Sequence, residues 1–204
     1  MIGIIDYGLG NIKAFETIYR RLHIPVKILR SIDDFSKISK LILPGVGAFD
    51  YAMLSYNKSG MREITEHLIF KEQIPIIGIC VGMQMMGLSS DEGNLPGLGW
   101  IEGNVKKFDV SKIKFQTHLP HMGWNEVNIC KDSPIFKNFL VNPKFYFLHS
   151  YYFECKDSKE SIGLTNYGID FTCAINHDNI FGVQFHPEKS HIVGIQLLEN
   201  FAKL

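Results

Sequence analysis

The residue best suited to chemistry in this sequence is Cys80, at the centre of the stretch Gly-Ile-Cys-Val-Gly. The apolar run 74–79 predicts a buried strand that stops at Cys80, and residues 81–88 predict the start of a helix. A nucleophile on such a sharp turn leaves little room for a Cβ at Gly78 and Gly82, and the helix N-terminus favours a thiolate. On this pattern alone, a small buried cysteine packed between two glycines is an equal alternative.

A base for this thiol occurs far downstream, where His186 follows a predicted strand at 181–185 and Glu188 lies two residues further on. If the backbone stays extended, side chains alternate and place His186 and Glu188 on the same side, while Pro187 disfavours a helix through Glu188. His186 would take the thiol proton, and Glu188 would orient and stabilise the imidazolium. His186 alone would fit a packed histidine at a strand end, and Glu188 alone would fit a solvated helix cap. Together with Cys80 they favour a catalytic triad.

Composition limits the other function classes. The chain has 204 residues, a hydrophobic fraction of 46%, and 21 basic against 21 acidic residues. This balance gives no electrostatic footprint for nucleic acid or an anionic membrane, and no run approaches the roughly 18 apolar residues of a membrane span. The first residues lack a basic region and predict a strand, not a signal peptide. The four cysteines are scattered, which indicates neither a disulfide framework nor a zinc site, so we expect a reduced, cytoplasmic protein.

The first half of the chain predicts strands that alternate with helices. Short apolar runs at 2–5, 26–29 and 41–43 precede the Cys80 strand, with helices expected up to about residue 23 and over about 61–71. This alternation indicates a parallel α/β sheet, in which sites gather at the carboxyl ends of the strands. Cys80 and the loops 6–11 and 44–49 would share that edge.

The loop 44–49 contains two glycines around one residue, Gly45-Val46-Gly47. Such a turn at a strand end can direct backbone N–H groups towards a site, as an oxyanion hole requires. The alternative is an ordinary strand-to-helix loop.

The second half differs in character. Its runs are shorter and richer in aromatic residues, which predicts antiparallel strands and hairpins, followed by a terminal helix over 192–201 that packs on the sheet. The predicted strands lie at 105–108, 126–129, 145–148, 162–164 and 171–175. Without a linker or repeat, residues 1–204 are expected to form a single domain.

Two patterns suggest cofactors only weakly. Gly8-x-Gly10 lacks the third glycine of a dinucleotide-binding loop, because Lys13 stands at that position. His118 and His121 have helical metal-ligand spacing, but Pro120 breaks such a helix. His149 lies in a strand-like run and fits a packed or interface histidine. We therefore expect no cofactor and no metal.

Six motifs give the whole chain a resemblance to a known family. Read end to end they are IDYGLGN, LPGVGAFD, GICVGMQ, LPHMGWNEV, YFLHSYY and GVQFHPEKS. The chain resembles the class I (triad) glutamine amidotransferases, and within them the glutaminase subunits of imidazole glycerol phosphate synthases. Val81 and Trp100 depart from the residues common there, without touching the triad. The resemblance implies a flavodoxin-like α/β fold, a mostly parallel sheet flanked by helices with an added antiparallel region.

That resemblance also implies a reaction and a partner. Cys80, His186 and Glu188 would hydrolyse L-glutamine to glutamate and ammonia. Oxyanion and substrate contacts would come from Gly45, Val46, Gly47, Val81, Gln84 and Glu92.

The ammonia would enter a (β/α)8 cyclase subunit in a heterodimer, docked near Asn11, Trp124, Tyr146 and Lys189. That subunit makes imidazole glycerol phosphate and aminoimidazole carboxamide ribonucleotide in histidine biosynthesis. The alternatives are a paralogue that serves another synthase, as in surface-sugar pathways, an independent cysteine hydrolase of the γ-glutamyl peptidase type, or a non-catalytic docking subunit. The intact triad disfavours the last.

Overall fold

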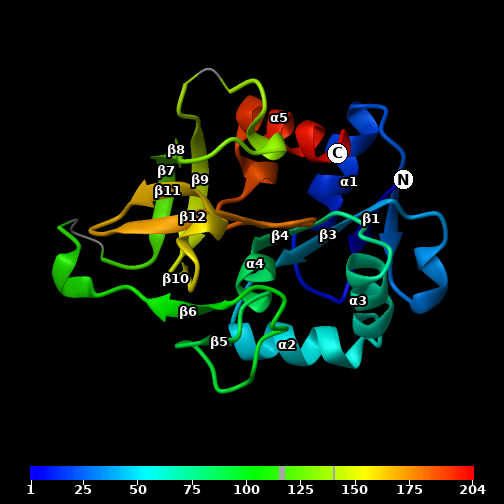
Figure 1. Cartoon of the computed structure of the whole chain (residues 1–204), viewed down its shortest axis with the longest axis horizontal. Coiled ribbons are helices and arrows are strands. Elements are labelled where there is room, and N and C mark those ends of the chain that lie inside the picture. Colours follow the sequence, from blue (N-terminus) through cyan, green and yellow to red (C-terminus); the bar gives the residue numbers. More distant parts are fainter. Residues whose placement is uncertain (115–117, 140) are drawn as a thin grey trace.

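The computed structural model describes residues 1–114, 118–139 and 141–204, and its core is one long sheet with helices on both faces (Figure 1). Half of this sheet is parallel, in the order β2-β1-β3-β4-β13. The bounds of these strands are β1 (Ile2–Ile5), β2 (Val26–Leu29), β3 (Lys40–Gly45), β4 (Ile76–Cys80) and β13 (Ile180–Val183). β1, β4 and β13 are buried along their whole length, as expected for parallel strands covered on both faces.

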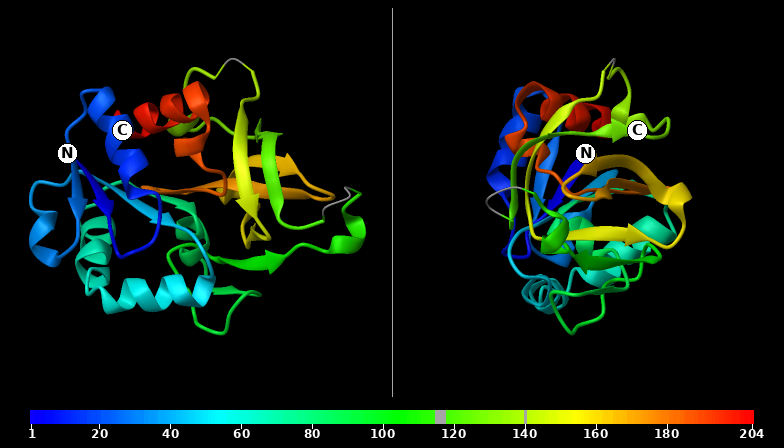
Figure 2. Two further views of the ribbon diagram at one scale, coloured as in Figure 1. Left: turned by 180° about the vertical axis from the view of Figure 1, so that it is seen from behind. Right: turned by 90° about the vertical axis from the view of Figure 1, so that its left-hand side faces the viewer.

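Four longer helices cover the parallel half. Helices α1 (Ile12–Arg21) and α5 (His191–Ala202) lie on one face, and α2 (Phe49–Lys58) and α3 (Arg62–Phe70) on the other (Figures 1 and 2). The short α4 (Val81–Met85) follows β4 directly. Single 3-10 turns are η1 (Ile32–Phe35), η2 (Val110–Lys112), η3 (Pro134–Phe136), η4 (Ser158–Glu160) and η5 (Pro187–Lys189).

Beyond β13 the sheet becomes mainly antiparallel. β12 (Asp170–His177) pairs with β13, β10 (Tyr151–Cys155) and β11 (Ser161–Asn166), and the outer strands are β6 (Gly103–Lys107), β5 (Ser89–Ser90) and β8 (Asn128–Ile129). A separate ribbon of β7 (His121–Glu126) and β9 (Lys144–His149) stands across this end of the sheet (Figure 2). The predicted α/β fold with an added antiparallel region is therefore confirmed.

The structure departs from the expected elements in several places. The strand expected at 126–129 is wrong, because the chain leaves the β7–β9 ribbon at Glu126 and enters the long sheet at Asn128. Helix α2 was not predicted, and α4 ends at Met85 instead of continuing to Leu88. There, Leu88 N–H donates to Gly103 O at 2.8 Å and the chain turns into β5.

The carboxyl edge of the parallel strands gathers the loops that the sequence singled out. Gly45 at the end of β3 is in register with Cys80 at the end of β4. The loop 6–11 packs against the same edge, since Tyr7 Oη donates to Pro44 O at 2.8 Å and a Cβ at Gly10 would lie 2.7 Å from Pro44 Cβ. Within the described ranges, no helix combines the length and the apolar character that a membrane crossing requires.

Candidate active site

Cys80 occupies a strained turn between β4 and α4. Its backbone has φ 54° and ψ −111°, a conformation that non-glycine residues rarely adopt and that marks a nucleophile elbow. A Cβ at Gly78 would lie 2.7 Å from Met83 N, and one at Gly82 would lie 1.9 Å from Leu43 O. Both glycines therefore serve close backbone approach around the turn, as the sequence predicted.

His186 and Glu188 meet beside Cys80. His186 Nδ1 lies 3.0 Å from Glu188 Oε1, and the two side chains are only 5% and 1% exposed. The expected extended backbone is wrong, because β13 ends at Val183 and Pro187–Lys189 forms the 3-10 turn η5. Pro187 opens this turn, where its missing N–H costs no hydrogen bond, and Ser190 Oγ donates to His186 O at 2.6 Å. The turn brings Glu188 back towards the imidazole.

The electrostatics of the pair favour a charged imidazole. Burial alone would lower the pKa of His186, but hydrogen bonds and charges from Cys80 and Glu188 outweigh it and raise that pKa to about 10. Since Nδ1 faces Glu188, the other ring nitrogen, Nε2, is the one available to the sulfur. This arrangement suits a thiolate–imidazolium pair at neutral pH.

The three remaining cysteines are free and lack such a setting. Burial raises the pKa of the Cys155 thiol to about 12, and it also raises the pKa of Cys173 and Cys130. All three are therefore ordinary thiols at neutral pH.

A pocket of about 280 Å³ opens in front of the triad. Cys80 and His186 line it together with the predicted residues Val46, Gly47, Val81, Gln84, Glu92 and Lys189. The predicted residue Gly45 does not line the pocket. It packs against the backbone of Val81 and Gly82, since a Cβ at Gly45 would lie 2.8 Å from Val81 C and 2.4 Å from Gly82 N. Residues 148–151, where β9 turns into β10, also line the pocket, and the sequence did not predict this.

Glu92 brings a negative charge to this pocket. Its Oε2 accepts a hydrogen bond from Phe49 N–H at 2.8 Å, at the first residue of α2. Asp50 holds the neighbouring loop by accepting from Asn94 N–H and Leu95 N–H. A fixed carboxylate in a pocket of this size suits a small substrate with an ammonium group.

Gln84 and the unpredicted residue Gln184 are joined below the sulfur. Gln84 Nε2 donates to Tyr151 O at 3.3 Å and to Gln184 Oε1 at 3.0 Å, and Gln184 Nε2 lies 3.6 Å from Cys80 Sγ. Gln184 is fully buried. Its signal in the sequence is an amide in an apolar strand run, two residues before His186 and so in phase with it.

Three of the four predicted docking residues cluster near the pocket mouth. Trp124 and Tyr146 are cross-strand partners in the β7–β9 ribbon, with ring centroids 6.1 Å apart. Lys189 Nζ lies 5.7 Å from the centre of the Tyr146 ring. Asn11 is exposed at the start of α1, a helix that also contacts η5, the turn that contains Lys189.

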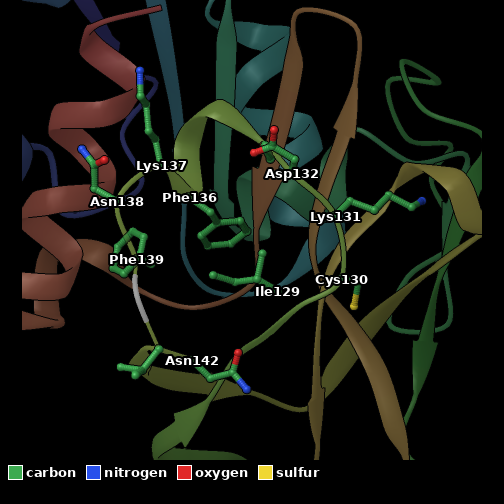
Figure 3. A pocket seen from close by; sticks show the side chains of 11 residues that line it. Ile129, Cys130, Lys131, Asp132, Phe136, Lys137, Asn138, Phe139 and Asn142 are labelled. Carbon is green, nitrogen blue, oxygen red and sulfur yellow. The ribbon is translucent and has the colours of Figure 1, made fainter.

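Another pocket, of about 480 Å³, lies between β8, η3 and the chain leading to β9 (Figure 3). Lys131 and Lys137 point away from each other around it, and Lys131 Nζ donates to Ser158 O at 2.9 Å. Its cysteine, Cys130, has no histidine among the residues that line this pocket. It therefore lacks the elements of the triad.

His121 and His149 form a buried pair beside the pocket, which His149 also lines. Their nearest ring nitrogens are 2.9 Å apart, and His149 Nδ1 lies 2.7 Å from Tyr151 O. Because a carbonyl only accepts, His149 is protonated at Nδ1 and takes its second hydrogen bond at Nε2 from His121 Nδ1–H. No group of three or more metal-binding side chains occurs in the described part of the chain.

This pair predicts a loss of stability in acid. Burial lowers the pKa of His121 to about 4 and that of His149 to about 3, below the unfolded value of about 6.5. The neutral forms therefore stabilise the fold fully above about pH 6.5, and this contribution disappears as the pH falls towards the folded values. From pH 7 to pH 5 each histidine should remove about 2 kcal/mol from the free energy of unfolding.

Urea unfolding of the wild type and of His149→Gln at both pH values measures this effect. The difference in stability between the two proteins should shrink by about 2 kcal/mol at pH 5, because the variant has lost one titrating group. Equal pH dependence in the two proteins would contradict the prediction.

The comparisons with known proteins agree with this geometry. The family model described as glutamine amidotransferase class-I matches residues 3–204. The chain belongs to the class-I glutamine amidotransferases. Two relatives named imidazole glycerol phosphate synthase subunit HisH align over 204 residues and 100% of both chains. They come from Bdellovibrio bacteriovorus, at 53% identity, and from Leptospira borgpetersenii, at 50%.

Solved structures share the fold over almost the whole chain. A structure described as a glutamine amidotransferase matches with a TM-score of 0.75 at 16% identity, covering 100% of this chain and 99% of that chain. A structure of PurLQS from Thermotoga maritima matches with a TM-score of 0.74 at 14% identity, covering 99% of this chain and 97% of that chain.

Proposed function

We propose that this chain is the glutaminase subunit of an imidazole glycerol phosphate synthase. It hydrolyses L-glutamine to glutamate and ammonia and delivers the ammonia to a (β/α)8 cyclase subunit in histidine biosynthesis. The observation that carries this proposal is a pocket of about 280 Å³ lined by Cys80, His186 and the fixed carboxylate of Glu92, with Glu188 paired to His186 behind it. The shared name of the full-length relatives supports the assignment to this synthase.

Glutamine binds with its side-chain amide at Cys80. The Glu92 carboxylate receives the α-ammonium group, because its Oε2 is anchored on Phe49 N–H while Glu92 lines the pocket. Both Gln84 N–H groups are used within the protein, which leaves Gln84 Oε1 to accept from the substrate.

The first half of the reaction forms a thioester. The Cys80 thiolate forms a bond to the side-chain carbonyl carbon, and His186 gives its Nε2 proton to the amide nitrogen as the carbon–nitrogen bond breaks and ammonia leaves. Glu188 keeps the imidazole in the orientation that this transfer needs. Backbone N–H groups of Val81 and of the turn 45–47 stabilise the oxyanion.

The second half releases glutamate. Neutral His186 takes a proton from water, whose oxygen forms a bond to the thioester carbon. The carbon–sulfur bond then breaks, and its electron pair returns to Cys80 as a thiolate. The triad is regenerated with an imidazolium beside a thiolate.

The partner docks at the exposed face of the β7–β9 ribbon. Successive residues of β7 alternate between a buried and an exposed face. The exposed face includes Met122, which is 60% exposed, and Trp124, which is 48% exposed. Tyr146 and Leu148 are their cross-strand partners, and Leu148 also lines the pocket. Apolar and aromatic side chains gathered beside a catalytic pocket suit a protein interface. Met122 and Leu148 extend the interface expected from the sequence.

The function is tested by mixing the purified chain with the (β/α)8 cyclase from the same genome and its formimino ribonucleotide. Formation of glutamate and imidazole glycerol phosphate in equal amounts is the expected result. Glutamate release that never yields the cyclase products would assign the chain to another synthase. Full turnover without any partner would favour an independent hydrolase.

The base and its orienting carboxylate should differ in their effects. His186→Asn should reduce glutaminase turnover nearly as much as loss of the nucleophile, by about 10⁴-fold or more. Glu188→Gln should cost less, because a neutral amide still accepts a hydrogen bond from Nδ1–H, whereas a lost proton carrier has no substitute. Steady-state assays of glutamate release measure both variants. A larger loss for Glu188→Gln would show that these roles are assigned wrongly.

A further inference from the structure

We propose that Gln184 is a further catalytic residue, whose side-chain N–H donates to the Cys80 sulfur and stabilises it as a thiolate. This inference rests on the proposed glutaminase function. Gln184 Nε2 lies 3.6 Å from Cys80 Sγ, and the side chain is fully buried beneath the sulfur, outside the residues that line the pocket. It thus touches the reacting atom without contacting the substrate pocket.

The orientation of the Gln184 amide follows from the groups around it. Tyr151 O can only accept, so Gln84 turns Nε2 towards it and uses its second N–H for Gln184 Oε1. With Oε1 thus occupied as an acceptor, Gln184 presents Nε2 to the sulfur. His149 Nδ1–H also donates to Tyr151 O, at 2.7 Å. It thereby holds the carbonyl that orients Gln84 and, through Gln84, the Gln184 amide.

The contacts of the sulfur differ between its two protonation states. A thiol can donate to Leu148 O, which lies 3.9 Å away, whereas a thiolate accepts from Gln184 Nε2–H and from His186. Gln184 therefore acts on the charged form. In the reaction this charge is consumed when the sulfur attacks and reappears when the thioester carbon–sulfur bond breaks. The donor helps form the thiolate and also helps it depart at the end.

Two substitutions separate donation from packing. Gln184→Met keeps a similar length and removes both hydrogen bonds, whereas Gln184→Glu keeps an oxygen for Gln84 and replaces the donor with a carboxylate oxygen. Gln73→Glu and Gln73→Met serve as controls, because Gln73 is exposed before the opposite end of β4. Thermal unfolding followed by circular dichroism establishes which variants are folded.

The first readout is alkylation of Cys80 by iodoacetamide, from about pH 5 to about pH 10, quantified by peptide mass spectrometry. One hydrogen bond to a charged group corresponds to about one pH unit or more in the midpoint. Gln184→Met should therefore raise the midpoint by about one unit and slow alkylation about tenfold at pH values below the midpoint. Gln184→Glu should slow it further, because its carboxylate faces the thiolate.

The second readout is the thioester itself, trapped by acid during turnover of glutamine. Slower departure of the thiolate should increase the thioester fraction in Gln184→Met and lower kcat more than kcat/KM. Folded Gln184→Met with the wild-type alkylation midpoint would overturn the proposal. If that variant does not fold, Gln184→Glu decides: an unchanged midpoint there would overturn it as well. Alkylation needs no glutamine and no partner, so it is independent of the proposed function, which the wild-type glutaminase assay tests in parallel.

Discussion

Replacing Cys80 with Ala or Ser is expected to abolish glutamine-dependent activity while ammonia-dependent synthesis by the complex survives. The thiol occupies the strained elbow, lines the pocket and contacts His186, so neither replacement leaves a comparable nucleophile. Loss of one triad member typically lowers turnover by about 10⁴-fold or more. Glutamate release and cyclase product are measured separately, first with glutamine and then with ammonium salt as the nitrogen source.

The matched control for this experiment is Cys130→Ala. Cys130 is an exposed, free cysteine with a raised pKa in a pocket that lacks the triad. The Cys130→Ala variant should retain wild-type activity with both nitrogen sources. Glutamine hydrolysis that persists in Cys80→Ala would remove Cys80 from the mechanism. Loss of both activities would instead indicate that the variant no longer forms the complex.

Much of the parallel half could be predicted because its signals are local. Short apolar runs between loops gave β1 and β2 with their observed bounds, and the strand-end positions of Cys80 and Gly45 placed both on one edge. Helix α2 was missed although its buried residues recur with helical spacing: Phe49, Ala52, Met53 and Tyr56. The glycine-containing loop just before it was interpreted as an oxyanion turn, and the helical spacing that follows was not recognised.

The antiparallel half was harder because tertiary pairing decides it. Residues 126–129 look like one strand, but the structure assigns their two ends to different sheets, with Val127 fully buried between them. No local pattern encodes such an exchange of partners. The 3-10 turn that brings Glu188 to His186 is likewise stabilised by Ser190, which also accepts a hydrogen bond from Tyr146 N–H of β9.

The same difference between local signals and tertiary pairing separates the site residues that were predicted from those that were missed. Cys80 ends a recognisable strand and His186 follows another, whereas residues 148–151 reach the pocket only through the β9–β10 turn. Gln184 contacts Gln84, one hundred positions earlier in the sequence, and this contact could not be inferred from spacing.

The chain alone is expected to be a poor glutaminase that its partner activates. Ammonia released to water becomes protonated and ceases to be a nucleophile, so hydrolysis serves synthesis only when the cyclase is docked and holds its nucleotide. The turn 45–47 is suited to such control. Gly47 has φ +85°, Val46 is 38% exposed, and both line the pocket beside Cys80. A glycine there permits a peptide flip at low steric cost.

Completing the oxyanion hole on docking should raise turnover by about 10² to 10³-fold, the usual effect of one donor. Glutamate release is measured for the purified chain, then with the cyclase, then with the cyclase and its ribonucleotide. Trp124→Ala should weaken this activation while leaving alkylation of Cys80 unchanged, because Trp124 lies on the exposed ribbon face and not in the triad pocket.

Ile32→Ala is the control for this variant, since Ile32 is 57% exposed in η1, next to the far edge strand β2. It should be activated like the wild type. Equal loss of activation in Ile32→Ala and Trp124→Ala would argue against docking at the β7–β9 ribbon. Full turnover by the isolated chain would contradict activation altogether, because the oxyanion donors would then be in place before any partner binds.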